Sequence, residues 1–276
     1  MSKRAALKLT RRRFLGLTAS AVAGTAWWQW NEVDRLVVER RELHLPRWNA
    51  DGFKVAILAD FHANTRPEGE RAERAMRMAI GEKPDAILLV GDYVHKEWPE
   101  TLPSLETALA PARESASPVF AAMGNHDYWV STTAKIIEAL KRNGILLLRN
   151  EIADLDGVAI WGIDDGIENR DRHDALDGRR DSGSVLAMFH EPDCVARVDR
   201  RIGLMAAGHS HGGQICLPFG FPLHTPFGAR RYKSGFYADA KVPLYVTRGI
   251  GTVGPRKRSF CPPEVSLLTL FGGAGR

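Results

Sequence analysis

Cysteine is scarce in this 276-residue chain, and no two cysteines form a CxxC pair. Cys194, Cys216 and Cys261 are too few for a disulfide framework, and their spacing excludes a zinc ribbon and a thioredoxin-like redox site. Internal repeats and low-complexity tracts are also absent. The composition, 44% hydrophobic and 26% charged, excludes a disordered or collagen-like chain. The length suits one large domain or two small ones, with room for a substantial core.

Acidic residues are absent from the first 26 positions, and this absence accounts for the basic character of the chain. The formal charge is +5 and the pI is about 9.2. Six basic residues lie in positions 1–26, and without them 32 basic residues face 33 acidic ones. The rest of the chain is therefore close to neutral, which argues against nucleic acid as a partner.

The same terminus has the layout of an export signal. The run Thr10-Arg11-Arg12-Arg13-Phe14-Leu15 resembles a twin-arginine signal, and Ala21-Val22-Ala23 resembles a cleavage site. We therefore predict that residues 1–30 direct the chain to the twin-arginine export machinery, and that residues 31–276 form the main domain. The predicted location is the periplasm, or the outer side of the inner membrane.

Two alternatives for this segment stay open. Residues 14–30 form an uncharged stretch of 17 residues, which is near the lower limit for crossing a bilayer. An uncleaved stretch would give membrane association as an N-terminal anchor, with Trp27, Trp28 and Trp30 at the interface. The second alternative is a basic, disordered arm. Because no other uncharged run of this length follows, the remainder is expected to be a soluble domain.

Short apolar segments alternate with amphipathic ones along the rest of the chain. Strands are predicted at residues 54–59, 86–90, 119–123, 145–148, 158–163, 185–189, 204–207, 244–247 and 265–270, after a strand or hairpin arm at 33–46. Helices are predicted around residues 72–80, at 101–113, at 132–142 with Ser131 as the cap, and after Pro192. This alternation indicates α/β layering, with two sheets stacked inside helices.

Five of the predicted strands end in side chains that can bind a metal ion. The segments that follow them are Asp60-Phe61-His62, Gly91-Asp92, Gly124-Asn125-His126-Asp127, His190 and Gly208-His209-Ser210-His211. Sites in open α/β sheets form at the carboxyl ends of the strands, so these side chains are expected to meet. In an extended chain, residues two apart point to the same side, which would pair Asp60 with His62 and His209 with His211.

The types of ligand indicate two metal ions. Carboxylate, imidazole and amide oxygen suit Mn, Fe or Zn, whereas a closed structural zinc site would use thiolates. The candidates are too many for one tetrahedral ion: Asp60, His62, Asp92, Asn125, His190, His209 and His211. They fit two divalent metal ions that share a bridging carboxylate.

The ordered blocks DxH, GD, GNHD, a later His and GHxH resemble the signature of the calcineurin-like metallophosphoesterase family. The resemblance spans about residues 53–270. It implies a four-layer α/β/β/α sandwich of two mixed β-sheets flanked by helices. It also implies two sets of ligands: Asp60, His62, Asp92 and His211 for the first ion, with Asp92 bridging, and Asn125, His190 and His209 completing the second site.

The same resemblance assigns roles to two further residues. His126 would face the scissile phosphate, where it steadies the phosphoryl oxygens or protonates the leaving oxygen. Asp127 would orient the His126 ring. The implied function is hydrolysis of a phosphodiester bond by a metal-bridging hydroxide, because two cations neutralise the anionic substrate and acidify a water near neutral pH.

A closer resemblance is carried by the segments 209–214, 248–251 and 261–264. They are similar to the exported YkuE/YaeI-type phosphodiesterase branch, which also resembles enzymes that cleave the pyrophosphate of UDP-2,3-diacylglucosamine. A phosphoester linked to a lipid or to the envelope is therefore the expected substrate class, and pyrophosphate cleavage on a nucleotide-linked lipid is the alternative reaction. An alternative of another class is a non-catalytic envelope-binding protein with a vestigial metal site.

The remaining polar and aromatic candidates are assigned structural roles. The charged segment 164–183 and the loop Arg256–Arg258 are expected to face solvent, with contact to a phosphate or an anionic headgroup as the alternative for the loop. Four histidines are expected on the surface: His44, His95, His173 and His224, of which His224 is the candidate for lining the pocket. His95 stands where many relatives carry an acidic residue or Asn. Cys216 and Cys261 are expected to be buried, and Tyr128 and Trp129 to pack in the core or at the pocket rim.

Overall fold

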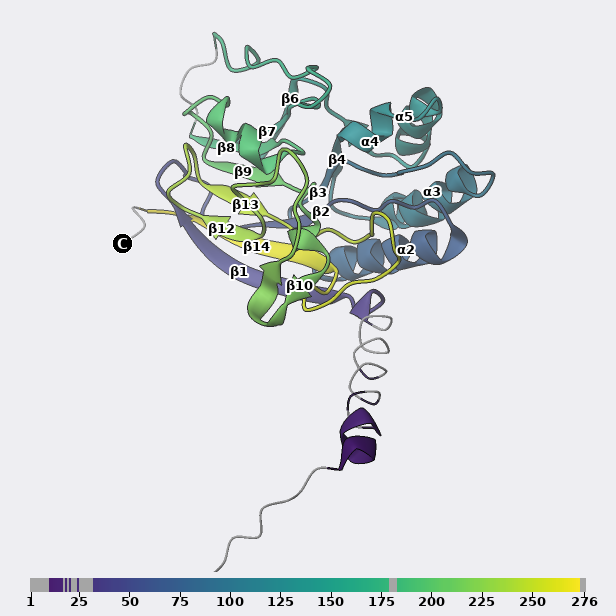
Figure 1. Cartoon of the computed structure of the whole chain (residues 1–276). Helices are drawn as coiled ribbons and strands as arrows, with labels where there is room; N and C mark the ends of the chain where they lie inside the picture. The colour runs from purple at the N-terminus through teal and green to yellow at the C-terminus, as the bar shows by residue number, and fades with distance from the viewer. Residues whose placement is uncertain are drawn as a thin grey trace, which may run out of the picture.

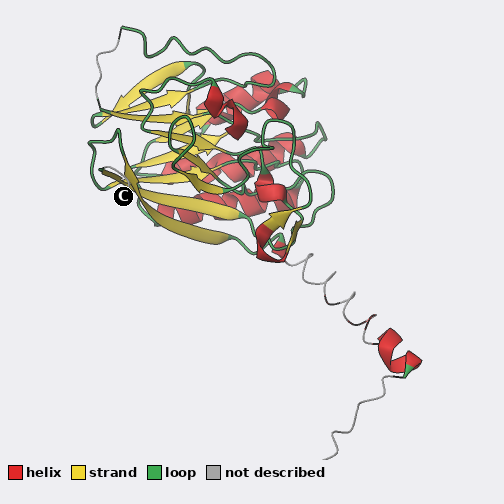
Figure 2. Ribbon diagram, turned by 60° about the vertical axis from the view of Figure 1, so that its left-hand side comes forward, coloured by secondary structure: helices red, strands yellow, loops and turns green. Residues whose placement is uncertain are grey.

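Two six-stranded mixed sheets form the centre of the molecule in the computed structural model, which describes residues 10–16, 18, 20, 24, 32–178 and 183–273 (Figure 1). The strand order is β1-β14-β2-β3-β4-β5 in the first sheet and β12-β13-β9-β8-β7-β6 in the second. The first and last strands of the main domain lie side by side, since β1 pairs with β14 in parallel. Figure 2 shows the helices along one side of this stack.

The bounds of the elements follow the predicted segments closely. The first sheet contains β1 (Val37–Leu45), β2 (Phe53–Leu58), β3 (Ala86–Val90), β4 (Val119–Ala122), β5 (Leu146–Leu147) and β14 (Glu264–Gly272). The second sheet contains β6 (Glu151–Leu155), β7 (Val158–Gly162), β8 (Ser184–Met188), β9 (Leu204–Ala207), β12 (Gly235–Tyr237) and β13 (Leu244–Val246). A separate hairpin consists of β10 (Cys216–Leu217) and β11 (Phe221–Pro222). The helices are α2 (Arg66–Gly81), α3 (Thr101–Leu109), α4 (Asn125–Tyr128) and α5 (Thr133–Arg142), with the 3₁₀ helices η1 (Ala110–Glu114), η2 (Pro192–Ala196), η3 (His211–Gly213) and η4 (Pro218–Gly220).

Apolar side chains fill three layers. Val55 and Leu88 of the first sheet share a buried cluster with Ile160 and Leu186 of the second, which joins the two sheets. On the outer side of the first sheet, α2, α3 and α5 pack on β2 and β3, so these strands are buried on both faces and have continuous apolar sequences. The outer face of the second sheet is covered by η2 and the segment that continues to Ile202. The predicted sandwich of two mixed sheets with flanking helices is confirmed.

Two predicted helix boundaries are wrong. The helix expected after Pro192 is only the short η2, because the Asp193 carboxylate accepts the backbone N–H groups of Arg230, Arg231 and Tyr232 and so joins this segment to another loop. The residue that precedes α5 is Thr132 and not Ser131, whose hydroxyl donates to Glu97 at 2.7 Å.

The charged segment 164–183 does not face solvent along its whole length, contrary to the prediction. Asp164 and Asp165 are buried at its start. Asp164 accepts hydrogen bonds from the Tyr128 hydroxyl and from Arg149 at 3.0 Å. Burial, together with the neighbouring Glu191 carboxyl, raises the pKa of Asp165 to about 9. The beginning of this segment therefore belongs to the domain interior, close to β8.

The predicted export signal lies mainly outside the described residues. This holds for the cleavage-site candidate Ala21-Val22-Ala23 and for Trp27, Trp28 and Trp30. Residues 11–16, which include the arginine run, are helical. Within the described ranges, no helix has the length and apolar character needed to cross a membrane.

Candidate metal centre

All seven predicted ligands lie at one edge of the two sheets and are buried, as the strand-end pattern predicts. They come from five strand ends: Asp60 and His62 after β2, Asp92 after β3, Asn125 after β4, His190 after β8, and His209 and His211 after β9. Six of them form two groups of three. Within each group, the ligand atoms lie within 4.8 Å of one another. The first group is Asp60, His62 and His211, and the second is Asp92, His190 and His209.

The backbone at the ligands is not extended, and only one of the two expected pairs of residues two apart shares a ligand group. The φ angle is positive at Asp60 (56°), His62 (44°), Asp92 (58°), His209 (64°) and His211 (50°). Non-glycine residues rarely adopt this region, and such strain is concentrated at functional sites. Asp60 and His62 belong to the same group as expected, whereas His209 and His211 belong to different groups although only one residue separates them in the chain.

Asp92, a member of the second group, also lies close to the first. Its Oδ2 atom is 3.6 Å from Nε2 of His62 and 3.1 Å from Nε2 of His190, which belong to different groups. The Nε2 atoms of His62 and His211 are 3.1 Å apart, a separation that suits two nitrogens bound at about 2.0–2.1 Å to one ion. The Asp92 carboxylate is therefore placed to bridge two ions.

Backbone carbonyls orient two of the imidazoles. Nδ1 of His190 donates to the carbonyl of Val90 at 2.6 Å, and Nε2 of His209 donates to the carbonyl of Phe227 at 2.8 Å. Each bond occupies one ring nitrogen and leaves the other to bind a metal once it has lost its proton, which is the usual arrangement around a ligating histidine. Burial holds the pKa of His62 and of His211 well below its ordinary value, so both rings are neutral and ready to coordinate.

The oxygen ligands complete the donor set. Burial raises the pKa of Asp60 to about 7. Burial also acts to raise the pKa of Asp92. The positive charge of His190 outweighs this effect and holds the pKa of Asp92 well below its ordinary value. Both amide atoms of Asn125 are buried and have no hydrogen-bond partner among the described residues. An orphaned buried amide is costly unless it has a ligand, so Asn125 fits the predicted role of a metal ligand.

Gly124 makes the close approach of β3 and β4 possible. A Cβ atom at this position would lie 2.4 Å from Oδ1 of Asp92 and 2.7 Å from its backbone nitrogen. No side chain tolerates such contacts, so the glycine of the GNHD block is required for Asn125 and Asp92 to share one site.

His126 lies beside the two groups, but Asp127 does not orient its ring, contrary to the prediction. The backbone N–H of His126 donates to Oδ1 of Asp92 at 3.0 Å. The Asp127 carboxylate accepts backbone N–H groups from Asp92 at 2.9 Å, Tyr93 at 2.8 Å and Gly124 at 3.0 Å. Asp127 therefore fixes the turn that carries the bridging carboxylate.

The ring of His126 is instead hydrogen-bonded to His95, which corrects the expectation that His95 is a surface residue. The two Nδ1 atoms are 2.7 Å apart, and His95 is only partly exposed. Trp129 packs edge-on against the other side, with ring centroids 4.5 Å apart. The only sequence signal for this contact is that His95 departs from the residues common at its position.

We expect His95→Ala to lower kcat for phosphodiester hydrolysis by about 10–100-fold, because the His126 ring loses the partner that fixes it. KM and the metal content should stay unchanged, since His95 belongs to neither ligand group. The His95→Asp variant should recover most of the rate, because a carboxylate can also accept from Nδ1 of His126. Steady-state kinetics with metal analysis checks this, and equal rates for His95→Ala and the unmodified chain would contradict it.

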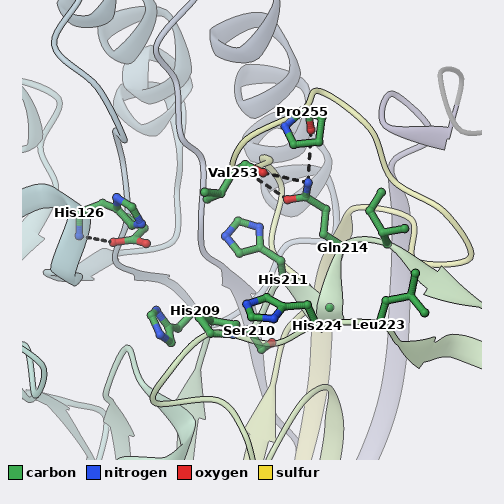
Figure 3. A pocket seen from close by; sticks show the side chains of 13 residues that line it. His126, His209, Ser210, His211, Gln214, Leu223, His224, Val253 and Pro255 are labelled. Atoms are coloured by element: carbon green, nitrogen blue, oxygen red, sulfur yellow. Dashed lines mark hydrogen bonds between the residues drawn. The ribbon is translucent and has the colours of Figure 1, made fainter.

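A pocket of about 280 Å³ opens next to the ligands (Figure 3). Figure 3 shows His126 and His209 on one side and Leu223 on the other. The far wall is mainly apolar and includes Ile215, Leu223, Pro226, Val253 and Pro255. His224 lines this pocket, as predicted. The pocket can therefore hold an apolar group next to a reacting centre at the metal ligands.

Gln214 fastens the pocket wall to the turn that carries His211. Its amide donates to the carbonyl of Val253 at 3.0 Å and accepts from the Val253 backbone N–H at 2.9 Å. This explains the glutamine of the His209–Gln214 segment, for which the sequence alone offers no role.

Arg258 is completely buried, so the prediction of a solvated loop at 256–258 is wrong for this residue. Its guanidinium donates to the carbonyls of Arg248 at 2.9 Å, Gly251 at 2.8 Å and Cys261 at 3.2 Å. The neighbouring Arg256 pairs with Asp34 at 3.0 Å. Cys216 and Cys261 are buried, as predicted, and neither forms a disulfide. Arg258 therefore holds together the loops behind His211.

Replacing Arg258 by Met should destabilise the fold by about 3 kcal/mol or more, because several buried carbonyls would lose their donor. The measurement is the midpoint of urea unfolding, followed by circular dichroism. The matched control is Lys257→Met, at a neighbouring and partly exposed cation, which should change the midpoint little. Similar midpoints for the two variants would show that the buried guanidinium does not stabilise these loops.

Comparison with known proteins agrees with this geometry. The family model described as calcineurin-like phosphoesterase matches residues 53–233. The chain is 33% identical to "Phosphodiesterase YaeI" of Escherichia coli (strain K12), over 95% of this chain and 99% of the relative. It is 28% identical to "Uncharacterized metallophosphoesterase YkuE" of Bacillus subtilis (strain 168), over 95% of this chain and 98% of the relative.

A third relative is "UDP-2,3-diacylglucosamine pyrophosphatase LpxG" of Chlamydia trachomatis, which is 25% identical over 92% of this chain and 97% of the relative. The family match covers more than half of the sequence and contains all seven candidate ligands together with His126. The chain therefore belongs to the calcineurin-like phosphoesterase family.

Proposed function

We propose that this protein is a metal-dependent phosphodiesterase that works at the cell envelope. The observation that carries the proposal is the position of Asp92, which belongs to one buried group of three candidate ligands and lies 3.6 Å from His62 of the other group, with His126 beside them. Asp60, His62 and His211 would hold one divalent ion, and His190, His209 and Asn125 the other, with Asp92 shared. Mn, Zn or Fe would suit this donor set. Two bound ions would neutralise the phosphate charge and supply the nucleophile near neutral pH.

The side chains outside the ligand groups would position the substrate and move a proton. Burial lowers the pKa of His126 and, together with His126, lowers that of His95 to about 4, so both rings are neutral at pH 7. Two neutral imidazoles that meet through Nδ1 share one proton there. The negative charge of a bound phosphate would favour a second proton on His126, so that its Nδ1 donates to His95 and its Nε2 gives the other proton to the leaving oxygen, which returns the ring to its neutral form. Trp129 and His95 hold the ring in this orientation.

The test is hydrolysis of bis-p-nitrophenyl phosphate by the purified full chain, reconstituted in turn with Mn²⁺, Zn²⁺, Fe²⁺ and Co²⁺. The metal content of each sample is measured in parallel. Turnover that follows metal occupancy supports the proposal. If the chain binds metal and no reconstituted form turns over either this diester or a pyrophosphate, the non-catalytic alternative is correct.

The apolar pocket favours a second candidate reaction, which is pyrophosphate cleavage on a nucleotide-linked lipid. Ile215, Leu223 and Val253 provide a wall that suits hydrocarbon, directly beside the ligands. The relative named UDP-2,3-diacylglucosamine pyrophosphatase LpxG supports the same substrate class. Comparing kcat/KM for UDP-2,3-diacylglucosamine with that for bis-p-nitrophenyl phosphate decides between the two reactions.

We also propose that residues 1–30 export the chain through the twin-arginine pathway. The support is the arginine run at 11–13 followed by an uncharged stretch. Replacing Arg11, Arg12 and Arg13 by Lys should keep the chain in the cytoplasm, while cell fractionation should find the unmodified chain in the periplasm or the inner membrane. Recovery of both forms from the cytoplasm would contradict export.

A further inference from the structure

Large apolar side chains are exposed on one part of the surface. The main domain has nine such residues among those described, and six of them lie on or next to the hairpin β10–β11: Leu217, Phe219, Phe221, Leu223, Phe227 and Phe260. We call these six residues the hairpin patch. Phe219 at the tip is 96% exposed, and Phe227 is 70% exposed. Single exposed apolar residues are common, but a cluster of this kind marks an interaction surface.

The conformation of the hairpin presents these rings to solvent. Its strands pair only with each other, through Cys216↔Pro222 and Leu217↔Phe221. Phe219 stands between Pro218 and Gly220 and has a φ angle of 68°, which is unfavourable for a bulky side chain. An aromatic ring held at an exposed tip in a strained conformation gains nothing for the isolated fold. It is therefore expected to have a partner outside the domain.

The hairpin patch is continuous with the pocket beside the metal ligands. Leu223 belongs to both, since it lines the pocket and is itself exposed. Phe260 reaches the hairpin because Ser259 pairs with Ile215 and accepts the backbone N–H of Cys216 at 2.9 Å. Phe227 follows the pocket residue Pro226 in sequence, and its carbonyl holds His209. A group bound to the patch therefore has direct access to the pocket.

The chain segment that carries most of the patch is positively charged, although the Asp193 carboxylate lies against the backbone of Arg230 and Arg231. No acidic residue occurs from Gly208 to Ala238, a segment that carries Arg230, Arg231 and Lys233. The guanidinium of Arg230 lies over the Phe227 ring, 5.7 Å from its centroid. Neither Arg230 nor Arg231 has a side-chain ion pair with any residue in the described ranges. Exposed aromatic rings beside unpaired cations are typical of surfaces that dock on anionic lipid.

The N-terminal end of the domain lies on the same side. The carboxylate of Asp34 pairs with Arg256, which follows the pocket residue Pro255. In both Figure 1 and Figure 2, the chain enters the domain next to the small hairpin. The uncharged stretch at residues 14–30 precedes this entry point in the sequence. A membrane that holds this stretch would therefore face the hairpin patch.

We propose that the hairpin patch docks on the surface of an anionic lipid bilayer, with Phe219 and Phe221 inserted among the acyl chains. Arg230 and Arg231 lie at the level of the headgroups. Docking turns the mouth of the pocket toward the membrane, so that a lipid-linked phosphoester reaches the metal ligands without leaving the bilayer. The docking itself does not depend on the proposed enzymatic activity.

The test places an environment-sensitive fluorophore at the tip of the hairpin in the full chain. Cys194, the one partly exposed cysteine, is first replaced by Ser, and the label is then attached to Phe219→Cys. The matched control carries the label at Leu146→Cys, an exposed apolar position on β5 away from the hairpin. Vesicles contain phosphatidylglycerol and phosphatidylethanolamine, with or without nitroxide-labelled acyl chains as quenchers.

We expect a blue shift and acyl-chain quenching at position 219 and neither effect at position 146. A label at Phe227→Cys should also show the blue shift and the quenching, and the double substitution Phe219→Ser/Phe221→Ser should abolish both signals. If residues 14–30 do not hold the chain on the membrane, the same double substitution should weaken vesicle affinity about tenfold or more. If the label at position 219 stays in water while the chain sediments with vesicles, the N-terminal stretch alone binds the membrane and the proposal is wrong. Equal signals on purely zwitterionic vesicles would exclude the role of the cations. Because none of these signals requires turnover, failure of the docking proposal and failure of the enzyme proposal are distinguishable.

Discussion

The Asp92→Asn variant should lose phosphodiesterase activity by about 10³-fold or more and should bind fewer than two metal ions. The substitution keeps the shape of the side chain and removes the negative charge shared by both ligand groups. Because bound metal ions supply several kcal/mol of transition-state stabilisation, and about 1.4 kcal/mol corresponds to a factor of ten, losing the second ion alone accounts for a loss of this size.

The measurement combines metal analysis with steady-state hydrolysis of bis-p-nitrophenyl phosphate. Asp85→Asn is the matched control, since Asp85 immediately precedes β3 whereas Asp92 lies beyond its other end. Its carboxylate accepts the backbone N–H of Lys54 at 2.7 Å, so it should alter stability slightly and leave metal content unchanged. If Asp92→Asn keeps two ions and a tenth of the activity, the carboxylate does not bridge.

The second prediction is that His126→Ala lowers kcat by about 10²–10⁴-fold, the range typical of general acid catalysis, without loss of metal. Metal should be retained because the His126 ring belongs to neither ligand group. The loss should be smallest for a p-nitrophenolate leaving group and largest for an alkoxide, because only a poor leaving group needs the proton.

This dependence separates the two roles implied for His126. If the ring only steadies the phosphoryl oxygens, the loss is the same for every leaving group. His44→Ala is the control, because His44 lies on β1 and stacks on Phe271, with ring centroids 5.4 Å apart and no contact with the centre among its described contacts. Full activity of His126→Ala on an alkyl phosphodiester would remove His126 from the mechanism.

The local sequence was enough to bring the candidate ligands together at one edge of the sheets, because each one follows a short, continuously apolar strand. Strands β2, β3, β8 and β9 are buried along almost their whole length, so their apolar runs stand out and their ends can be located. Edge elements have no such signal. Strand β6 is half-exposed, and the hairpin β10–β11 packs on neither sheet, so neither appeared among the predicted elements.

The sequence could not predict the contacts of single side chains where these contacts depend on residues distant in the chain. Asp127 is adjacent to His126, yet its carboxylate turns to the backbone of Asp92 and Tyr93, while His95 reaches the ring from another loop. Arg258 stands in a basic run that suggests a solvated loop, yet carbonyls from three segments enclose it. Composition gives no sign of the partners of Asp127 and Arg258, because they are backbone groups present in every sequence.

By itself, the sequence determined the fold class, the seven candidate ligands and the nearly neutral charge of the main domain, since hydrophobic periodicity and ordered motifs are local properties. The tertiary structure decided how the ligands divide into two groups, which residue orients His126, and where the exposed aromatic rings lie relative to the pocket. The physical reason is the left-handed backbone at five ligands and the long-range pairing of loops, both of which exist only after the sheets have packed. The separation of His209 and His211 into different groups shows this most directly.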